Sequence, residues 1–215
     1  QASESGLVYT PTEISALSRV AKGNGLSIHM DGARFANAVA SQQVTPSELS
    51  WKAGVDVLCL GATKCGALCA EVVIFFNKGL AKTFIHRRKR GGHLLSKGRV
   101  FGAQMVGWLQ DDHWLELAKH ANTQAVKLAE TINGIDGLQL VWPVESNELF
   151  VVMPKGLATY LRDAGAEFYD WYADTLPPNV TLQDDQQFAR LVTSFATQDS
   201  HRQEFSELIR GYFIS

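Results

Sequence analysis

The first part of the chain alternates helix-forming and strand-forming patterns. Two segments have a Thr, a Pro directly after it and a Glu three positions after the Thr, which is typical of a capped helix start; these are Thr10–Glu13 and Thr45–Glu48. We expect a further helix over Ala33–Ala40. Short apolar runs lie between these helices and predict strands at Leu26–Met30, Val55–Leu60 and Glu71–Phe76. This alternation predicts an α/β fold with a mostly parallel sheet covered by helices.

The pattern changes after residue 77. Longer helices are predicted at Leu80–Arg90 and His113–Ile132, and shorter ones at Leu157–Ala164 and Ser200–Tyr212. Strands are predicted at Leu138–Pro143, Glu148–Pro154 and Phe188–Ala196. We therefore expect two domains, with residues 1–112 belonging to an α/β domain and residues 113–215 forming a smaller α+β domain.

Composition narrows the class of protein. The 215 residues carry a net charge of −2, with 46% hydrophobic and 20% charged residues, which is typical of a globular protein and favours neither a nucleic-acid nor a membrane partner. The basic run His86–Arg99 is better explained as a solvated helix face or a contact between subunits. Cys59, Cys65 and Cys69 suit a reduced, cytoplasmic protein, and because they lack paired spacing we expect small core residues and no metal site.

Two residues at strand ends suggest chemistry. Asp31 follows one predicted strand, where a carboxylate is costly unless it is paired or caps the next helix. Lys64 follows another strand among small residues, which we expect to desolvate its ammonium and make the amine nucleophilic; an exposed loop lysine is the alternative. Both side chains could face one edge of the sheet. Pyridoxal phosphate requires such a pair, a lysine for its aldehyde and a carboxylate for its ring nitrogen.

Three motifs make a family resemblance specific. HMDGAR at residues 29–34, GATKCG at 61–66 and ARLVTSF at 189–195 resemble the low-specificity threonine aldolases and β-eliminating lyases among the fold-type I pyridoxal-phosphate-dependent enzymes. The resemblance implies that Lys64 binds the cofactor aldehyde, that Asp31 pairs with the pyridine nitrogen and that Arg34 contacts the ring substituents. It also implies that Arg190 binds the α-carboxylate of the substrate.

The implied reaction is cleavage of the Cα–Cβ bond of L-threonine, L-allo-threonine or a related β-hydroxy amino acid to glycine and an aldehyde. The family's phosphate-binding glycine loop and ring-stacking residue have no counterpart here, so we expect the chain to be the C-terminal portion of a longer enzyme. The family also implies a homodimer or homotetramer. Alternatives are another fold-type I lyase, β-eliminating or similar to serine hydroxymethyltransferase, and an inactive fragment that serves as an interaction module.

Overall fold

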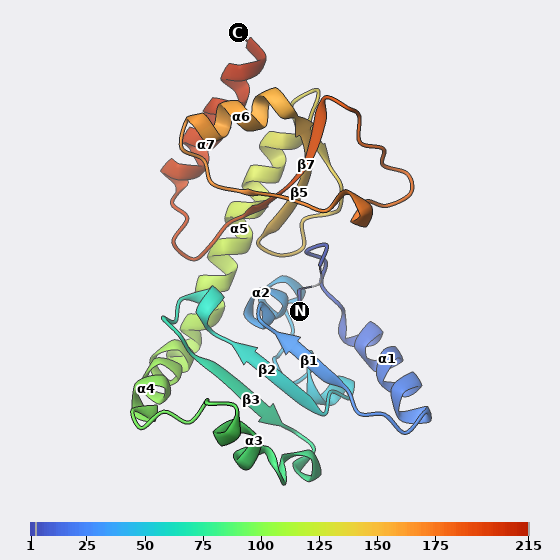
Figure 1. Cartoon of the computed structure of the whole chain (residues 1–215), viewed down its shortest axis with the longest axis vertical. Coiled ribbons are helices and arrows are strands. Elements are labelled where there is room, and N and C mark those ends of the chain that lie inside the picture. Colours follow the sequence, from blue (N-terminus) through green and yellow to red (C-terminus); the bar gives the residue numbers. More distant parts are fainter. Residues whose placement is uncertain (3, 215) are drawn as a thin grey trace. The chain divides into compact units, whose positions relative to one another are not determined.

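The computed structural model describes residues 1–2 and 4–214. The chain forms two compact units (Figure 1): the first contains residues 8–118 with the first two residues, and the second contains Lys119 onward with the segment before Val8. The long helix α5 (His113–Asn133) begins in the first unit and continues into the second. No helix among the described residues is long and apolar enough to cross a membrane.

The first unit has a three-stranded sheet in the order β1-β2-β3. Its strands are β1 (His29–Gly32), β2 (Val57–Gly61) and β3 (Glu71–Phe75), and its helices are α1 (Pro11–Gly23), α2 (Phe35–Gln42), α3 (Phe84–Arg90) and α4 (Gly98–Leu109). Strands β1 and β2 are parallel, as predicted, but β3 runs antiparallel to β2. The connection over residues 62–70 explains this difference, because a parallel return needs a crossover of a dozen or more residues.

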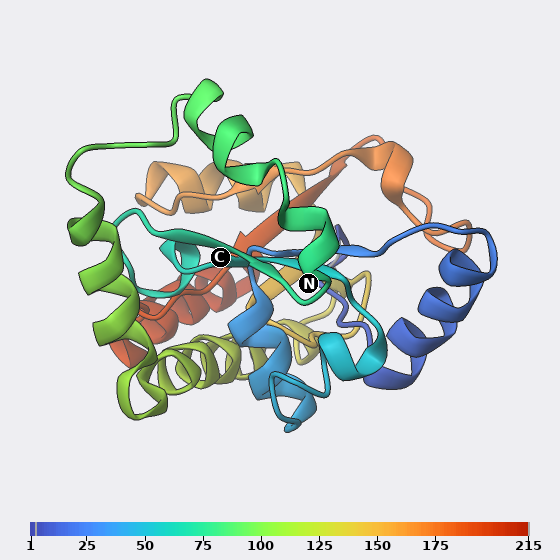
Figure 2. The same cartoon turned by 90° about the horizontal axis from the view of Figure 1, so that it is seen from below.

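The two faces of this sheet differ in burial. Met30, Leu58 and Leu60 point to one face and form part of the hydrophobic core. His29, Asp31 and Cys59 alternate with them and so lie on the other face, which is exposed or half-buried. Helices α2 (blue) and α3 (green) lie on opposite sides of these strands in Figure 2. His29 and Asp31 of the HMDGAR motif therefore lie on this less buried face, which we call the open face of the sheet.

The two capping boxes have different outcomes. The Thr10 side chain accepts a hydrogen bond from the Glu13 N–H at 3.2 Å, and the Glu13 carboxylate accepts one from the Thr10 N–H at 2.8 Å, so the predicted start of α1 is confirmed. Thr45 and Glu48 form the same reciprocal bonds. However, turns follow there, and only a short 3₁₀ helix (Trp51–Ala53) precedes Gly54. The short helix predicted from this capping box is therefore limited to a single 3₁₀ turn.

The second unit has a four-stranded antiparallel sheet in the order β4-β5-β7-β6. Its strands are β4 (Gln139–Leu140), β5 (Glu148–Pro154), β6 (Tyr169–Asp170) and β7 (Gln186–Val192), and its further helices are α6 (Lys155–Asp163) and α7 (Asp199–Ile214). One face packs Leu149, Val151 and Leu191 into a core with the helices. The opposite face carries a separate aromatic cluster around Phe150 and Phe188, joined by Trp142 and Trp171. Arg190 lies on this second face, because it pairs with Phe150 across the sheet.

Candidate active site

Asp31 lies near the carboxyl end of β1 and is exposed. Its Oδ1 accepts a hydrogen bond from the Ala33 N–H at 2.9 Å, which is a local turn. Helix α2 begins at Phe35, and its N-cap position is Arg34. Asp31 is therefore not the N-cap of α2.

Two glycines allow the turn after Asp31 to lie close against β2. A Cβ atom on Gly32 would be 2.6 Å from the Cys59 carbonyl oxygen, and one on Gly61 would be 2.9 Å from the Ala33 Cα. Real Cβ atoms do not approach other atoms so closely, so both positions require glycine. This close approach brings the loop that leads from β1 to α2 beside the end of β2, from which the chain continues to Lys64.

Lys64 is in a 3₁₀ turn (Thr63–Cys65) that follows β2 directly. The turn is anchored by Cys65, which is 3% exposed: its thiol contacts the Trp114 carbonyl oxygen at 3.4 Å, and its own carbonyl accepts the Trp108 indole N–H at 2.7 Å. Burial raises the pKa of the Cys65 thiol to about 11, so this anchor is neutral at physiological pH. Lys64 itself is exposed, so the expected desolvation by its small neighbours is not present in this chain.

The open face also holds residues that the motifs did not single out. The His29 Nε2 lies 3.2 Å from the Cys59 Sγ, and Cys59 is directly opposite Asp31 across the β1–β2 pair. Burial raises the pKa of the Cys59 thiol, and the nearby negative charges of Asp31 and Glu71 raise it further. Cys59 is half-buried and Cys69 exposed, so of the three cysteines only Cys65 is the core residue that was expected. Strand alternation from Asp31 could have identified His29, but the placement of Cys59 and Glu71 depends on sheet register.

Arg34 is half-buried at the N-cap position of α2, three residues after Asp31. Its backbone is near φ −126° and ψ 33°, and its side chain does not cap the helix. The structure thus places Arg34, Asp31 and the Lys64 turn in the same unit, on a parallel strand pair whose carboxyl ends lie at the same edge of the sheet. Open α/β sheets bind ligands at such an edge.

Arg190 belongs to the second unit and lies in β7. Its Nη1 is 3.7 Å from the Glu148 Oε1, and the Glu148 side chain is only 3% exposed. Its guanidinium carbon lies 4.3 Å from the centre of the Trp171 ring and 5.9 Å from that of Tyr169. The Arg190 side chain is only 23% exposed and β7 is paired on both sides, so Arg190 is not on a solvated strand edge.

The first unit has two of the groups that pyridoxal phosphate requires, a lysine amine and a carboxylate. The Lys64 amine makes no hydrogen bond or ion pair with any described residue, and the Asp31 carboxylate is exposed at the end of the neighbouring strand. An accessible amine can bind an aldehyde, and an accessible carboxylate can pair with a protonated pyridine nitrogen. Within the described residues, no group of three or more His, Cys, Asp or Glu could hold a metal ion.

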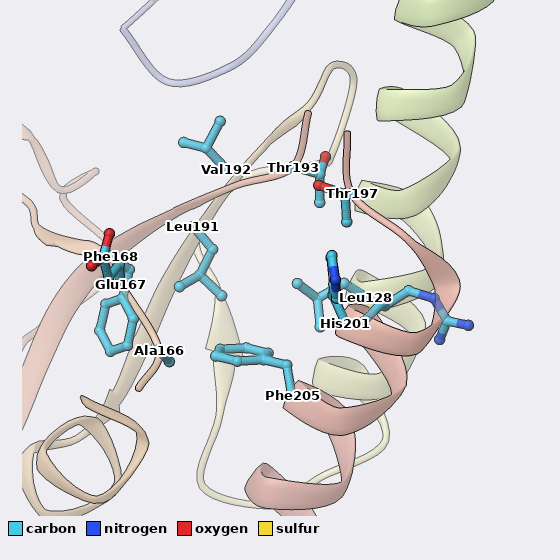
Figure 3. A pocket seen from close by; sticks show the side chains of 11 residues that line it. Leu128, Ala166, Glu167, Phe168, Leu191, Val192, Thr193, Thr197, His201 and Phe205 are labelled. Carbon is cyan, nitrogen blue, oxygen red and sulfur yellow. The ribbon is translucent and has the colours of Figure 1, made fainter. Parts of the chain in front are cut away.

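A separate pocket of about 180 Å³ lies in the second unit between β7 and α7 (Figure 3). Leu128, Leu191 and Phe205 provide apolar walls. The Thr193 hydroxyl donates to the Ala121 carbonyl at 2.8 Å, and the Arg202 guanidinium bonds to Gln124 and Asp199. These polar groups already have hydrogen-bond partners within the fold. The pocket is therefore a weaker candidate for a ligand-binding site than the open face of the first unit.

Comparisons with known proteins identify the family of the chain. A family model for beta-eliminating lyases matches residues 1–155. A low specificity L-threonine aldolase from Pseudomonas aeruginosa is 48% identical over 174 residues, which are 81% of this chain and 50% of the relative. The corresponding protein from Pseudomonas sp. strain NCIMB 10558 is 41% identical over 211 residues, or 98% of this chain and 58% of the relative.

A solved structure of a threonine aldolase from Leishmania major superposes with a TM-score of 0.87 at 29% identity and covers 98% of this chain. This chain covers 58% of that structure. The chain thus spans between half and three fifths of the length of these relatives.

Proposed function

The chain belongs to the beta-eliminating lyase family, and we propose that it provides part of a pyridoxal-phosphate-dependent aldolase of amino-acid metabolism. The substrate is L-threonine, L-allo-threonine or a related β-hydroxy amino acid, which the enzyme cleaves between Cα and Cβ. The observation that carries the proposal is the placement of Asp31 and Lys64 at the carboxyl ends of neighbouring parallel strands. The names of the Pseudomonas relatives support the same reaction.

Lys64 and Asp31 have different roles in this proposal. The Lys64 nitrogen binds the aldehyde carbon of the cofactor, and the Cys65 anchor fixes the turn that carries it. Asp31 holds a proton on the pyridine nitrogen through its carboxylate, and its bond from the Ala33 N–H fixes the orientation of that carboxylate. Bound pyridoxal phosphate would supply an electron sink for cleavage of the Cα–Cβ bond, in which the β-hydroxyl group loses its proton to form the aldehyde and Cα gains a proton to give glycine.

The two arginines bind and orient the cofactor and the substrate in this proposal. Arg34 follows Asp31 by three residues and is the candidate contact for the substituents of the cofactor ring. Arg190 presents a planar guanidinium, which suits bidentate recognition of a carboxylate. We assign it to the α-carboxylate of the amino-acid substrate. Its stacking on Trp171 supports this role, because a stacked guanidinium is fixed before the substrate arrives.

The assembly and its location are part of the same proposal. The segment over α3 and α4 exposes large apolar side chains, among them Ile85, Leu95, Val100 and Val106, each more than half exposed. Exposed apolar surface of this extent is typical of a protein–protein interface. Together with the basic residues of α3 it supports a homodimer or homotetramer. The three free cysteines support a reducing, cytoplasmic location.

The test uses the natural polypeptide that carries this sequence, purified with pyridoxal phosphate. We expect an absorbance band of the lysine-bound cofactor in the wild type, its loss in Lys64→Ala, and release of acetaldehyde and glycine from L-threonine. Lys52→Ala is a matched control and should keep the band, because Lys52 lies before β2 and away from its carboxyl end. Formation of 2-oxobutyrate and ammonia would instead assign β-elimination. A band that survives in Lys64→Ala would contradict the assignment of the lysine.

A further inference from the structure

Arg190 is enclosed on the aromatic face of the second unit. It pairs across the sheet with Phe150 on one side and with Tyr169 on the other. The Trp171 ring lies over its guanidinium at 4.3 Å, and Trp171 is joined to β7 by a backbone bond from its N–H to the Phe188 carbonyl at 2.7 Å. The Trp171 ring also packs edge-on against Phe150 at 5.5 Å. The position of the ring is therefore set by both backbone and packing.

Glu148 forms an ion pair with one edge of the Arg190 guanidinium. Its carboxylate is 3.7 Å from Nη1, which lies on the Cδ side of the group. Glu148 is enclosed, because the backbone near Gly6 packs against it: a Cβ on Gly6 would be 3.3 Å from the Glu148 Cβ. The Gly6 carbonyl in turn accepts the Ser146 hydroxyl at 2.9 Å. Glu148, the negatively charged partner of Arg190, is thus held in place by the packing of the fold.

The opposite edge of Arg190 consists of Nε and Nη2, and neither atom bonds to a described residue. Nε is buried, and a buried donor without an acceptor is unfavourable. These two N–H groups are parallel and match the two oxygens of a carboxylate. A carboxylate that binds this edge would satisfy Nε and would leave the Glu148 contact at Nη1 intact.

We propose that Trp171 is a positioning residue that holds the Arg190 guanidinium with its Nε–Nη2 edge ready for the α-carboxylate of the substrate. The inference rests on the proposed function, in which Arg190 is the carboxylate receptor. The Trp171 ring fixes the plane of the guanidinium, and Glu148 fixes its rotation within that plane. Trp171 therefore determines affinity for the carboxylate and does not take part in bond cleavage.

Propionate is the probe, because it has a carboxylate and lacks the amino group that would react with the cofactor. We measure its dissociation constant by calorimetry, and its inhibition constant against L-threonine, in the natural polypeptide. Trp171→Leu should raise both constants about tenfold, since a partly desolvated cation–π contact is worth one to two kcal/mol. Trp171→Phe keeps an aromatic face and should raise them only about twofold. The kcat value should change by less than about twofold in either variant, because uniform binding affects KM.

Trp142→Leu is the matched control. Trp142 belongs to the same cluster, at 5.2 Å from Phe150 and 5.9 Å from Phe188, but it is not stacked on Arg190. It should lower thermal stability and leave propionate binding unchanged. Equal effects of Trp142→Leu and Trp171→Leu would overturn the proposal, because they would indicate a general loss of packing. So would unchanged binding in Trp171→Leu alongside lost binding in Arg190→Leu. Binding that survives even in Arg190→Leu would overturn the carboxylate role of Arg190 itself.

Discussion

The two units present charged residues in opposite ways. In the first, Asp31 and Lys64 are exposed on the open face and edge of a sheet, and their surroundings leave their reactive atoms accessible. In the second, Arg190 is half-buried against the Trp171 ring and paired with the buried Glu148. An exposed group contributes little to stability and can react, whereas an enclosed pair is expensive to break. Substitutions in the two units should therefore separate activity from stability.

The largest expected effect is on catalysis in the first unit. Asp31→Asn keeps the shape of the side chain and removes its charge, so kcat for threonine cleavage should fall by about 10²–10³, as for loss of another aligned electrostatic group. The free energy of unfolding should change by less than about 0.5 kcal/mol, because Asp31 is exposed. Steady-state kinetics and urea unfolding of the natural polypeptide measure the two quantities.

Asp56→Asn is the control for Asp31. Its carboxylate accepts the Ile28 N–H at 2.9 Å, just before β2 and at the opposite end of the strand from the Lys64 turn. This substitution should leave kcat within about twofold of the wild type. If Asp56→Asn lowered kcat as much as Asp31→Asn, the Asp31 carboxylate would have no special relation to the cofactor.

For Glu148, the buried acid of the second unit, we expect the main effect of substitution to be on stability. Glu148→Ala breaks its pair with Arg190 and should lower the free energy of unfolding by about 2–3 kcal/mol, below the usual cost for a fully buried pair because Arg190 is 23% exposed. Glu167→Ala removes an exposed glutamate from the same unit and should cost less than about 0.5 kcal/mol. Equal denaturation midpoints for these two variants would show that the Glu148–Arg190 pair does not stabilise the unit.

The cysteines allow a pH test within the first unit. Burial raises the pKa of Cys65 from 9.0 to about 11. A pKa raised by folding stabilises the protein fully below the unfolded value, and this stabilisation is lost as the pH rises through the folded value. The free energy of unfolding should thus fall by about 2 kcal/mol between pH 9 and 11 through Cys65 alone.

Replacement by alanine isolates this contribution. Cys65→Ala should be less stable than the wild type at pH 8, and its stability should fall less steeply above pH 9. Cys69→Ala should keep the wild-type slope, because Cys69 is exposed. Denaturation midpoints measured at pH 8, 9, 10 and 11 give the slopes. Identical slopes for Cys65→Ala and the wild type would be inconsistent with a buried neutral thiol at this position.

Local signals in the sequence predicted much of the fold. Strand β5 has the predicted bounds, Glu148–Pro154, because a continuous apolar run follows Glu148 and is buried on both faces. The strand predicted at Leu26–Met30 begins later, at His29, since Gly25 has φ +68° and Leu26 is 63% exposed. The antiparallel direction of β3 follows from the short connection between it and β2, a signal that the predicted strand bounds already contained. The two-residue strand β6 depends on pairing with β7, which no local pattern encodes.

In the candidate site too, some residues could be predicted from the sequence and others could not. Asp31 and Lys64 could be found because each directly follows a strand-like run, and their roles came from the family motifs. The residues around Arg190 could not be found, because Glu148 and Trp171 are far from it in sequence and meet it only through the β5–β7 register and the course of the chain after β6. Likewise, Cys59 faces Asp31 through the parallel register of β1 and β2.

The smallest predicted effect concerns the two capping boxes. They show that the capping bonds can form whether or not an α-helix follows them. Thr10→Ala removes the cap of a 13-residue helix and should cost about 1 kcal/mol of unfolding free energy. Thr45→Ala removes the same bonds from a turn that no α-helix follows, so it should cost about half as much, or about 0.5 kcal/mol. Urea unfolding of both variants at pH 7 measures the difference. If Thr45→Ala lost more unfolding free energy than Thr10→Ala, the turn at residues 45–50 would contribute more to the stability of the first unit than the start of α1 does.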